Sequence, residues 1–200
     1  LKRHFSRINL ITPVYPELGA WLADEHLPGL KEMYELAKSR CKWIVLADLI
    51  RLVTVFHTGG LYLDADCFPE QGLAAQLQGE VVLFKEMTVD PTTALGPRED
   101  KSPASAVRVA NFAFYARRPR NPFIRACILE CVRRLREILV EENQESVHTD
   151  ADILWVCGPD VITTVFRKRQ GLTGRTRLLT ASIAGHRAAG TWRRKRRYNR

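Results

Sequence analysis

The sequence has no long hydrophobic run. A membrane-spanning helix needs about 18 consecutive apolar residues, and the sequence contains no such stretch. The most apolar segment, residues 43–56, is interrupted by Asp48 and Arg51. The sequence also lacks an initiator methionine and a signal peptide, so we interpret it as a fragment whose membrane anchor would lie upstream. Its 200 residues, 46% of them hydrophobic, are enough for one globular domain with a real core.

Cysteine is sparse and has no metal-binding spacing. None of the cysteines belongs to the doubled pairs of a structural zinc site, which excludes zinc ribbons and fingers. Cys127 and Cys131 are four residues apart and would share a helix face, where we expect buried free thiols. The odd number of cysteines leaves at least one thiol free in a monomer. The five are Cys41, Cys67, Cys127, Cys131 and Cys157.

The positive charge is concentrated at one end of the sequence. Of the net charge of +9, six charges lie in residues 193–200, which leaves +3 for everything before them. We therefore divide the chain into a single domain, residues 1–192, and a basic tail, residues 193–200. The tail is either simply solvated or attracted to an anionic membrane surface or another polyanion. We predict no specific nucleic-acid site.

Helical and extended patterns alternate along the chain. In residues 44–57 the apolar residues recur at helical spacing, and the double glycine Gly59–Gly60 ends the pattern. The alternation predicts an α/β domain. Further helices are predicted over residues 31–38, 122–140 and 159–169, strands over residues 61–63, 80–84, 108–116 and 177–183, and a long loop over residues 88–105.

The stretch ADLIRLVTVFHTGGLYLDAD, residues 47–66, sets charged residues in an otherwise apolar segment. Asp48 and Arg51 are three residues apart on the predicted helix and therefore share a face. Taken alone, this pair would be a surface salt bridge. The Gly-Gly turn, however, can bring the following strand back beside the helix, which would place the pair near Asp64 and Asp66.

The strand after the glycines ends in two carboxylates. Asp64 and Asp66 alternate with Ala65, so in an extended chain both side chains point to the same side. Open α/β sheets bind ligands at the carboxyl ends of their strands. Two carboxylates at such a position suit a hard divalent cation, Mg²⁺ or Mn²⁺, which substrate phosphates commonly complete.

The complete pattern resembles that of a known enzyme family. A-D-x-x-R, seven residues, then G-G-x-Y-x-D-x-D is similar to the signature of glycosyltransferase family 32, the DXD-containing sugar transferases. Relatives in that family include fungal mannosyltransferases, the animal α1,4-galactosyltransferase and the clostridial glucosylating toxins. The anchors present here are Ala47, Asp48, Arg51, Gly59, Gly60, Tyr62, Asp64 and Asp66.

Weaker similarities follow in the family's order. Asn111 begins a segment that resembles N-x-x-x-x-A, with Arg118–Pro119 where the family has His-Pro. Residues 157–159, Cys-Gly-Pro, resemble the family's T-G-P turn. His186 and the pair Thr191–Trp192 resemble the terminal H-x-x-x-S-W.

The front of the chain departs from the family pattern. Nothing in residues 1–40 resembles the family's I-P-K-x-I-H-x-x-W strand, whose tryptophan helps to hold the nucleotide base. We expect that this base-binding strand is missing, or that base recognition is done differently.

The resemblance implies a GT-A-like fold, in which a Rossmann-like mixed sheet flanked by helices binds a nucleotide-diphospho-sugar. It implies Mn²⁺ or Mg²⁺ as cofactor and transfer of a sugar from a UDP- or GDP-sugar, with retention, to a glycan, lipid or protein acceptor. No residue is assigned as nucleophile. The implied residues are Asp48, Arg51, Asp64 and Asn111 for catalysis, Asp48, Arg51, Tyr62, Asp64 and Trp192 for donor binding, and Asp64, Asp66 and His186 for the metal.

The family resemblance also implies where the protein is located and from which side the acceptor approaches. If the protein is eukaryotic, such a domain would lie in the Golgi lumen, with its anchor outside this chain. We expect the acceptor to approach over residues 88–105 and the C-terminal segment.

Three other interpretations stay open. The chain could be an inactive transferase-like domain, because the front strand is not found. It could be a polyanion- or membrane-binding module that uses its tail, and its binding would then fall steeply with salt. It could also be a haloacid-dehalogenase-like phosphatase with Asp64 as nucleophile and Asp66 as acid/base. That fold needs a closing acidic pair, whereas residues 158–160, Gly-Pro-Asp, contain one acid.

Overall fold

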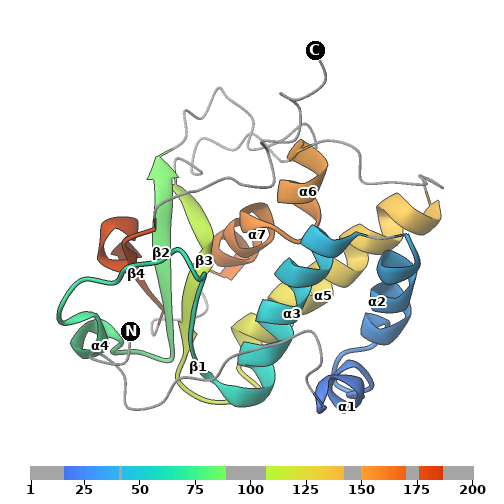
Figure 1. Cartoon of the computed structure of the whole chain (residues 1–200), viewed down its shortest axis with the longest axis horizontal. Helices are drawn as coiled ribbons and strands as arrows, with labels where there is room; N and C mark the ends of the chain where they lie inside the picture. Colours follow the sequence, from blue (N-terminus) through green and yellow to red (C-terminus); the bar gives the residue numbers. More distant parts are fainter. Residues whose placement is uncertain (1–15, 41, 89–106, 142–149, 170–175, 187–200) are drawn as a thin grey trace.

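The computed structural model describes residues 16–40, 42–88, 107–141, 150–169 and 176–186. Within them, a four-stranded sheet has the order β1-β3-β2-β4 (Figure 1), made by β1 (Gly60–Leu63), β2 (Val81–Thr88), β3 (Val107–Ala116) and β4 (Thr176–Thr180). β3 is antiparallel to both β1 and β2, whereas β4 is parallel to β2. This mixed sheet, flanked by helices, confirms the predicted α/β class.

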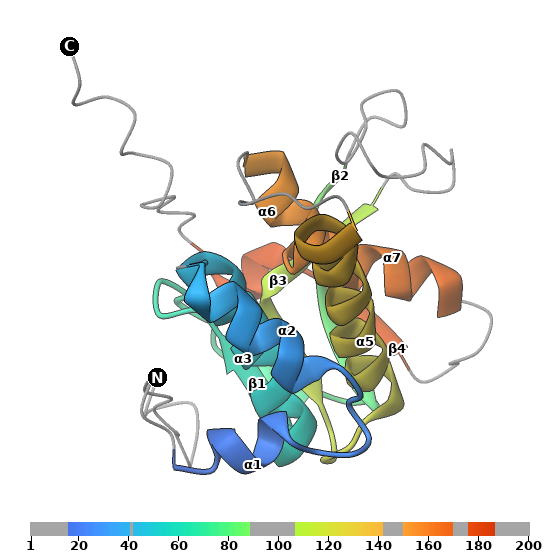
Figure 2. The same ribbon diagram turned by 90° about the vertical axis from the view of Figure 1, so that its right-hand side faces the viewer.

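Most of the helices cover one face of the sheet. They are α1 (Leu18–Leu22), α2 (Leu30–Ser39), α3 (Trp43–Thr58), α4 (Leu73–Gln76), α5 (Pro122–Arg136), α6 (Asp150–Val156) and α7 (Pro159–Arg169), with a π-helical turn η2 (Glu137–Glu141) and a 3₁₀ helix η3 (Ala181–Ala184). α3, α5 and α7 lie to the right of the sheet in Figure 1, and Figure 2 shows α2 packed with α3 and α5 on that side. α4 and η3 lie on the opposite face.

The sheet separates two apolar cores. The larger core joins the helices to one face of β2 and β3, where Leu83 and Phe114 are buried. The smaller core lies under α4 and η3 and contains Phe84 and Phe112. Successive residues of β2, such as Leu83 and Phe84, therefore point to opposite cores, as the pleat of a strand requires.

α3 leads directly into the candidate site. Packing of the apolar face of α3 against the larger core stabilises this helix more than the helix propensities of its residues do. The helix ends at Gly59, whose φ is +65°. A Cβ at Gly59 would come within 3.0 Å of the Arg118 backbone and 3.1 Å of Pro119, so glycine is needed where the chain reverses into β1. Buried residues on α3 include Leu49, Leu52, Val53 and Phe56.

Several predicted boundaries are wrong. The strand predicted over residues 177–183 ends at Thr180, after which η3 takes over. The helix predicted over residues 122–140 is α-helical only to Arg136 and continues as the π-helical turn η2. The helices α1, α4 and α6 were not predicted, because each is too short to show a clear period.

The described cysteines, Cys127 and Cys131 among them, are buried and form no disulfide with one another. Cys41 lies outside the described residues, as do residues 89–105 of the predicted loop and the tail at 193–200. Among the helices that the structure describes, none combines the length and the apolar character needed to cross a bilayer.

Candidate functional site

The Asp48–Arg51 pair on α3 is buried. Arg51 Nη2 lies 2.9 Å from Asp48 Oδ1, and the two side chains are only 12% and 8% exposed. The interpretation of this pair as a surface salt bridge is therefore wrong. The side of α3 that carries the pair faces β1 and β3, which cover it from the sheet side.

β1 brings Asp64 to the same guanidinium. Arg51 Nη1 lies 3.1 Å from Asp64 Oδ1, and the Tyr62 hydroxyl donates to that oxygen at 2.7 Å. The guanidinium carbon of Arg51 lies 5.0 Å from the centre of the Tyr62 ring, within range of a cation–π contact. The Gly-Gly turn thus returns the strand beside the helix, and Arg51 bridges two carboxylates that are distant in the sequence.

Asn111 on β3 joins the same arrangement. Its side-chain Nδ2 donates to Asp48 Oδ1 at 3.1 Å, and its backbone carbonyl oxygen accepts from Arg51 Nη1 at 3.0 Å. Three elements, α3, β1 and β3, thereby contribute to one set of mutual hydrogen bonds and ion pairs. We call this set the buried network; it consists of Asp48, Arg51, Tyr62, Asp64 and Asn111.

Burial dominates the electrostatics of the buried network. Desolvation raises the pKa of Asp48 to about 7, because it outweighs the attraction of Arg51, and the like charge of Asp64 adds to the rise. Burial opposes the charge of Arg51, yet its acidic neighbours hold the Arg51 pKa above the ordinary value. Burial also raises the pKa of Tyr62, so the hydroxyl keeps the proton that it donates to Asp64.

The DXD residues lie on a turn that follows β1. The Asp64 N–H donates to Phe112 O at 2.8 Å, and the Cys67 N–H donates to Asp64 O at 3.0 Å, which closes the turn. The prediction of an extended chain through Asp66 is therefore wrong. The two carboxylates nevertheless converge, because the turn curls Asp66 back toward Asp64.

His186 reaches this turn from the segment after η3. Its Nε2 lies 3.4 Å from Asp66 Oδ1, and its ring stacks on Phe112 with centroids 3.9 Å apart and an interplanar angle of 14°. One ligand atom from each of Asp64, Asp66 and His186 lies within 4.8 Å of the other two. We call these three residues the acid–histidine cluster.

The acid–histidine cluster fits a divalent cation. Its side chains are 26%, 35% and 20% exposed in the order Asp64, Asp66, His186, so an ion and a phosphate could both reach them. Two carboxylates suit Mg²⁺ or Mn²⁺, and the imidazole shifts the preference toward a transition metal such as Mn²⁺. Arg51 and Tyr62 bond to one oxygen of Asp64 and thereby fix its orientation.

Comparison with known proteins agrees with this arrangement. Residues 20–85 match the family model described as "Glycosyltransferase sugar-binding region containing DXD motif". About a third of the chain is thus similar to the sugar-binding region of the DXD glycosyltransferases. The predicted family resemblance is thereby confirmed. Of the predicted residues, Asp48, Arg51, Tyr62, Asp64 and Asp66 lie inside the matched segment of the DXD glycosyltransferase region, whereas Asn111, His186 and Trp192 lie after it.

Solved structures also include a match. One is titled "PaToxG Glycosyltransferase"; the comparison has a TM-score of 0.46 and 17% sequence identity, over 76% of this chain and 43% of that chain. This chain thus spans less than half the length of that structure. No curated protein matches the sequence at a significant level.

The structure places all but one of the predicted site residues in these two sets. Asp48, Arg51, Tyr62, Asp64 and Asn111 meet in the buried network, and Asp66 and His186 join Asp64 in the acid–histidine cluster. Trp192 lies outside the described residues. Sequence reasoning missed Phe112, which supports both the turn and His186, because an apolar residue in a strand looks like any other core residue.

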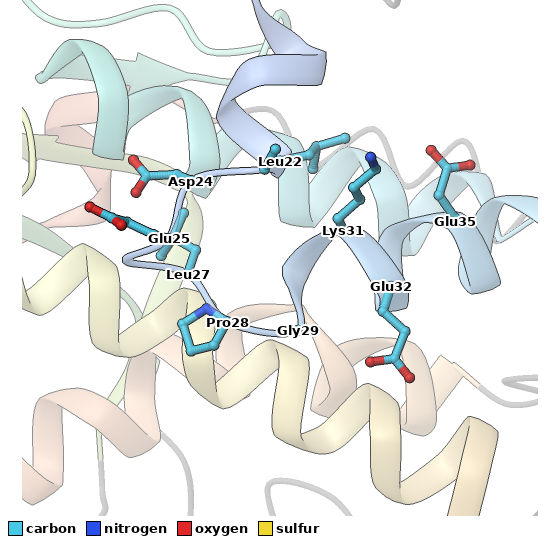
Figure 3. A pocket seen from close by; sticks show the side chains of 10 residues that line it. Leu22, Asp24, Glu25, Leu27, Pro28, Gly29, Lys31, Glu32 and Glu35 are labelled. Carbon is cyan, nitrogen blue, oxygen red and sulfur yellow. The ribbon is translucent and has the colours of Figure 1, made fainter.

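A separate hollow lies at α1 and α2. It has a volume of about 750 Å³ and opens between the loop after α1 and the first turns of α2 (Figure 3). Glu32 and Glu35 extend from α2 at its rim, whereas Asp24 points away from Lys31 toward the far side of the loop. The hollow shares no residue with the buried network or the acid–histidine cluster.

Proposed function

We propose that this chain is a metal-dependent glycosyltransferase that moves a sugar from a nucleotide-sugar to a glycan, lipid or protein acceptor. The observation that carries this proposal is the junction of the two sets at Asp64. There the acid–histidine cluster, which is suited to a cation, meets the buried network of hydrogen-bonding groups. Residues 20–85 of the same chain match the DXD glycosyltransferase region. A nucleotide-sugar has the corresponding two parts, an anionic diphosphate and a sugar ring with hydroxyl groups.

The acid–histidine cluster would hold the diphosphate end through Mn²⁺ or, less well, Mg²⁺. Asp66 and His186 would be ligands, and Asp64 would contribute its second oxygen or contact the ribose. A bound divalent ion supplies Lewis-acid stabilisation of the charge that develops on the leaving diphosphate. Tyr62 would keep Asp64 oriented by its hydrogen bond.

The buried network would hold the donor sugar. Asp48 and Arg51 are fixed in place by each other and by Asn111, so their rotamers need no reorganisation when a sugar binds. Carboxylate oxygens accept hydrogen bonds from sugar hydroxyls, and guanidinium N–H groups donate to them. Trp192 would add a donor contact from the C-terminal segment.

Transfer with retention and a Golgi lumenal location, if the protein is eukaryotic, are part of the same proposal. They rest on the family resemblance. We assign no nucleophile.

Hydrolysis of a panel of UDP- and GDP-sugars, with Mn²⁺, with Mg²⁺ and with chelator, tests the proposal. We expect turnover of one donor that depends on metal. Asp66→Ala should lower it by about 10³-fold, because a Lewis-acid metal contributes several kcal/mol. Glu70→Ala, which changes an exposed acid just beyond the cluster, is the matched control and should retain activity.

The same panel separates the alternatives. Metal-assisted binding of a nucleotide-sugar without turnover would indicate an inactive transferase-like domain. Turnover of a simple phosphate monoester would indicate a phosphatase. Polyanion or vesicle binding that survives Asp66→Ala and falls steeply with salt would indicate a binding module. No donor binding with any metal would contradict the proposed function.

A further inference from the structure

A close backbone crossing holds the acid–histidine cluster together. The Phe68 N–H donates to Gly185 O at 3.1 Å, and the Glu70 N–H donates to Ile183 O at 3.0 Å. Cys67 and His186 form an antiparallel bridge next to these bonds. The segment just after the DXD turn is therefore tied to the segment just after η3, although more than half of the chain separates them in sequence.

Gly185 makes this crossing possible for two independent reasons. Its φ is +63°, the left-handed region that favours glycine. In this conformation its N–H donates to Ser182 O at 2.9 Å and closes η3. In addition, a Cβ on Gly185 would collide with the carbonyl of Phe68. Any side chain at this position would push the two backbones apart.

The crossing determines where His186 lies. His186 follows Gly185 directly, and its ring is held between Phe112 on one side and the Asp66 carboxylate at its edge. Phe112 is almost completely buried in the smaller core, so it is a fixed surface for the imidazole. A displacement of Gly185 by a few tenths of an ångström would move the imidazole relative to Asp66.

We propose that Gly185 and Phe112 are positioning residues for the metal site. They do not touch the ion; they hold the His186 imidazole at the distance from Asp66 at which both can bind one cation. This inference rests on the proposed function, because it assumes that the acid–histidine cluster binds a metal. It extends that function to two residues outside the segment that matches the family model.

Mn²⁺ affinity of the purified protein, measured by electron paramagnetic resonance without any donor, tests this inference. Gly185→Ala should weaken Mn²⁺ binding about 10–100-fold, as loss of a supporting residue around a metal typically does. Gly72→Ala is the matched control. Gly72 also has a positive φ, +86°, but a Cβ there meets nothing within 4 Å. Gly72→Ala therefore places a side chain at a positive φ without causing a collision. The Mn²⁺ affinity of this variant should stay within about twofold of the wild type, since the site is untouched.

Phe112→Leu tests the same inference without a backbone collision. It keeps an apolar side chain in the smaller core and removes the ring against His186, so it should fold and bind Mn²⁺ several-fold more weakly. Circular dichroism establishes that each variant is folded. If Gly185→Ala does not fold, Phe112→Leu decides the inference alone.

A double-variant cycle separates positioning from a general loss of structure. In a His186→Ala background, Gly185→Ala and Phe112→Leu should each change Mn²⁺ affinity less than twofold, about the limit of independent behaviour. Equal losses in both backgrounds would overturn the inference, as would wild-type affinity in both folded variants. If the wild-type protein itself binds no Mn²⁺ without donor, this inference fails, whereas the donor panel separately decides the proposed function.

Discussion

The two halves of the candidate site differ in how complete they are without a ligand. In the buried network, every carboxylate already has a guanidinium or amide partner within hydrogen-bond distance. In the acid–histidine cluster, two carboxylates on a turn meet an imidazole from the segment after η3, and all three side chains are partly open to solvent. The buried network therefore contributes to folding before any sugar binds, whereas the acid–histidine cluster is open for a cation. Asp64 belongs to both, so it links the stability of the domain to occupancy of the site.

The largest contrast should appear in stability. Arg51→Met leaves Asp48 and Asp64 without their shared guanidinium, and breaking a buried pair typically costs about 3–5 kcal/mol. Asp66→Asn changes a half-open acid, and its cost should stay within about 0.5 kcal/mol, as for most surface substitutions. Urea unfolding of both variants gives the two values. Similar losses in both would contradict the inference that the buried network, and not the acid–histidine cluster, stabilises the fold.

The pH dependence of stability sharpens the same contrast. Asp48 has a folded pKa of about 7, raised from 3.8, so between these values the folded state binds the proton and the unfolded state does not. Stability from this group is therefore present at low pH and is lost as pH rises toward 7, by about 4 kcal/mol at most, since one pKa unit corresponds to 1.36 kcal/mol.

Asp48→Asn removes this group and isolates its contribution. Urea unfolding of the metal-free protein from pH 4.5 to pH 8 should show the variant becoming more stable relative to the wild type as pH increases. Parallel curves for the two proteins would mean that Asp48 does not titrate in this range.

Tyr62→Phe should have a smaller effect than Arg51→Met or the titration of Asp48. It removes one hydrogen bond to Asp64, of 2.7 Å, at the point where the two halves meet. We expect a loss of about 1 kcal/mol, or roughly fivefold in donor affinity, as for a single hydrogen bond. Isothermal titration with the donor found in the panel measures it. Tyr115→Phe, on β3 opposite Leu61, is the control, because the Tyr115 hydroxyl makes no hydrogen bond to the described residues. A larger effect in the control would contradict the assignment.

Much of the site could be predicted from local patterns. The helical period before Gly59, the double glycine and the spacing of Asp64 and Asp66 are short-range features, and they predicted that helix and strand return side by side. The helices over residues 31–38 and 159–169 are found close to their predicted bounds for the same reason. The strands predicted over residues 80–84 and 108–116 are also found, because apolar residues fill most of each segment.

What could not be predicted depends on contacts between distant segments. The burial of Asp48 follows from coverage by β1 and β3, and no feature of its own helix reveals it. The turn at Asp64–Cys67 replaces an extended chain because distant carbonyls accept hydrogen bonds on either side of it: Phe112 O from the Asp64 N–H and Gly185 O from the Phe68 N–H. β4 ends at Thr180 because η3 follows at once and leads to Gly185, whose carbonyl accepts from the Phe68 N–H just after the DXD turn. In each case a residue far along the chain decides the local conformation.

The crossing at Gly185 also has a consequence for the order in which the domain can assemble. On the ribosome, Asp64 and Asp66 emerge before η3 and His186, and β4 must find β2 across a long separation. Pairings of this kind form late, because chain closure must precede the contact that rewards it. A nascent chain can therefore hold the buried network while its cation ligands are still incomplete, so metal capture would follow the pairing of β4 rather than guide folding.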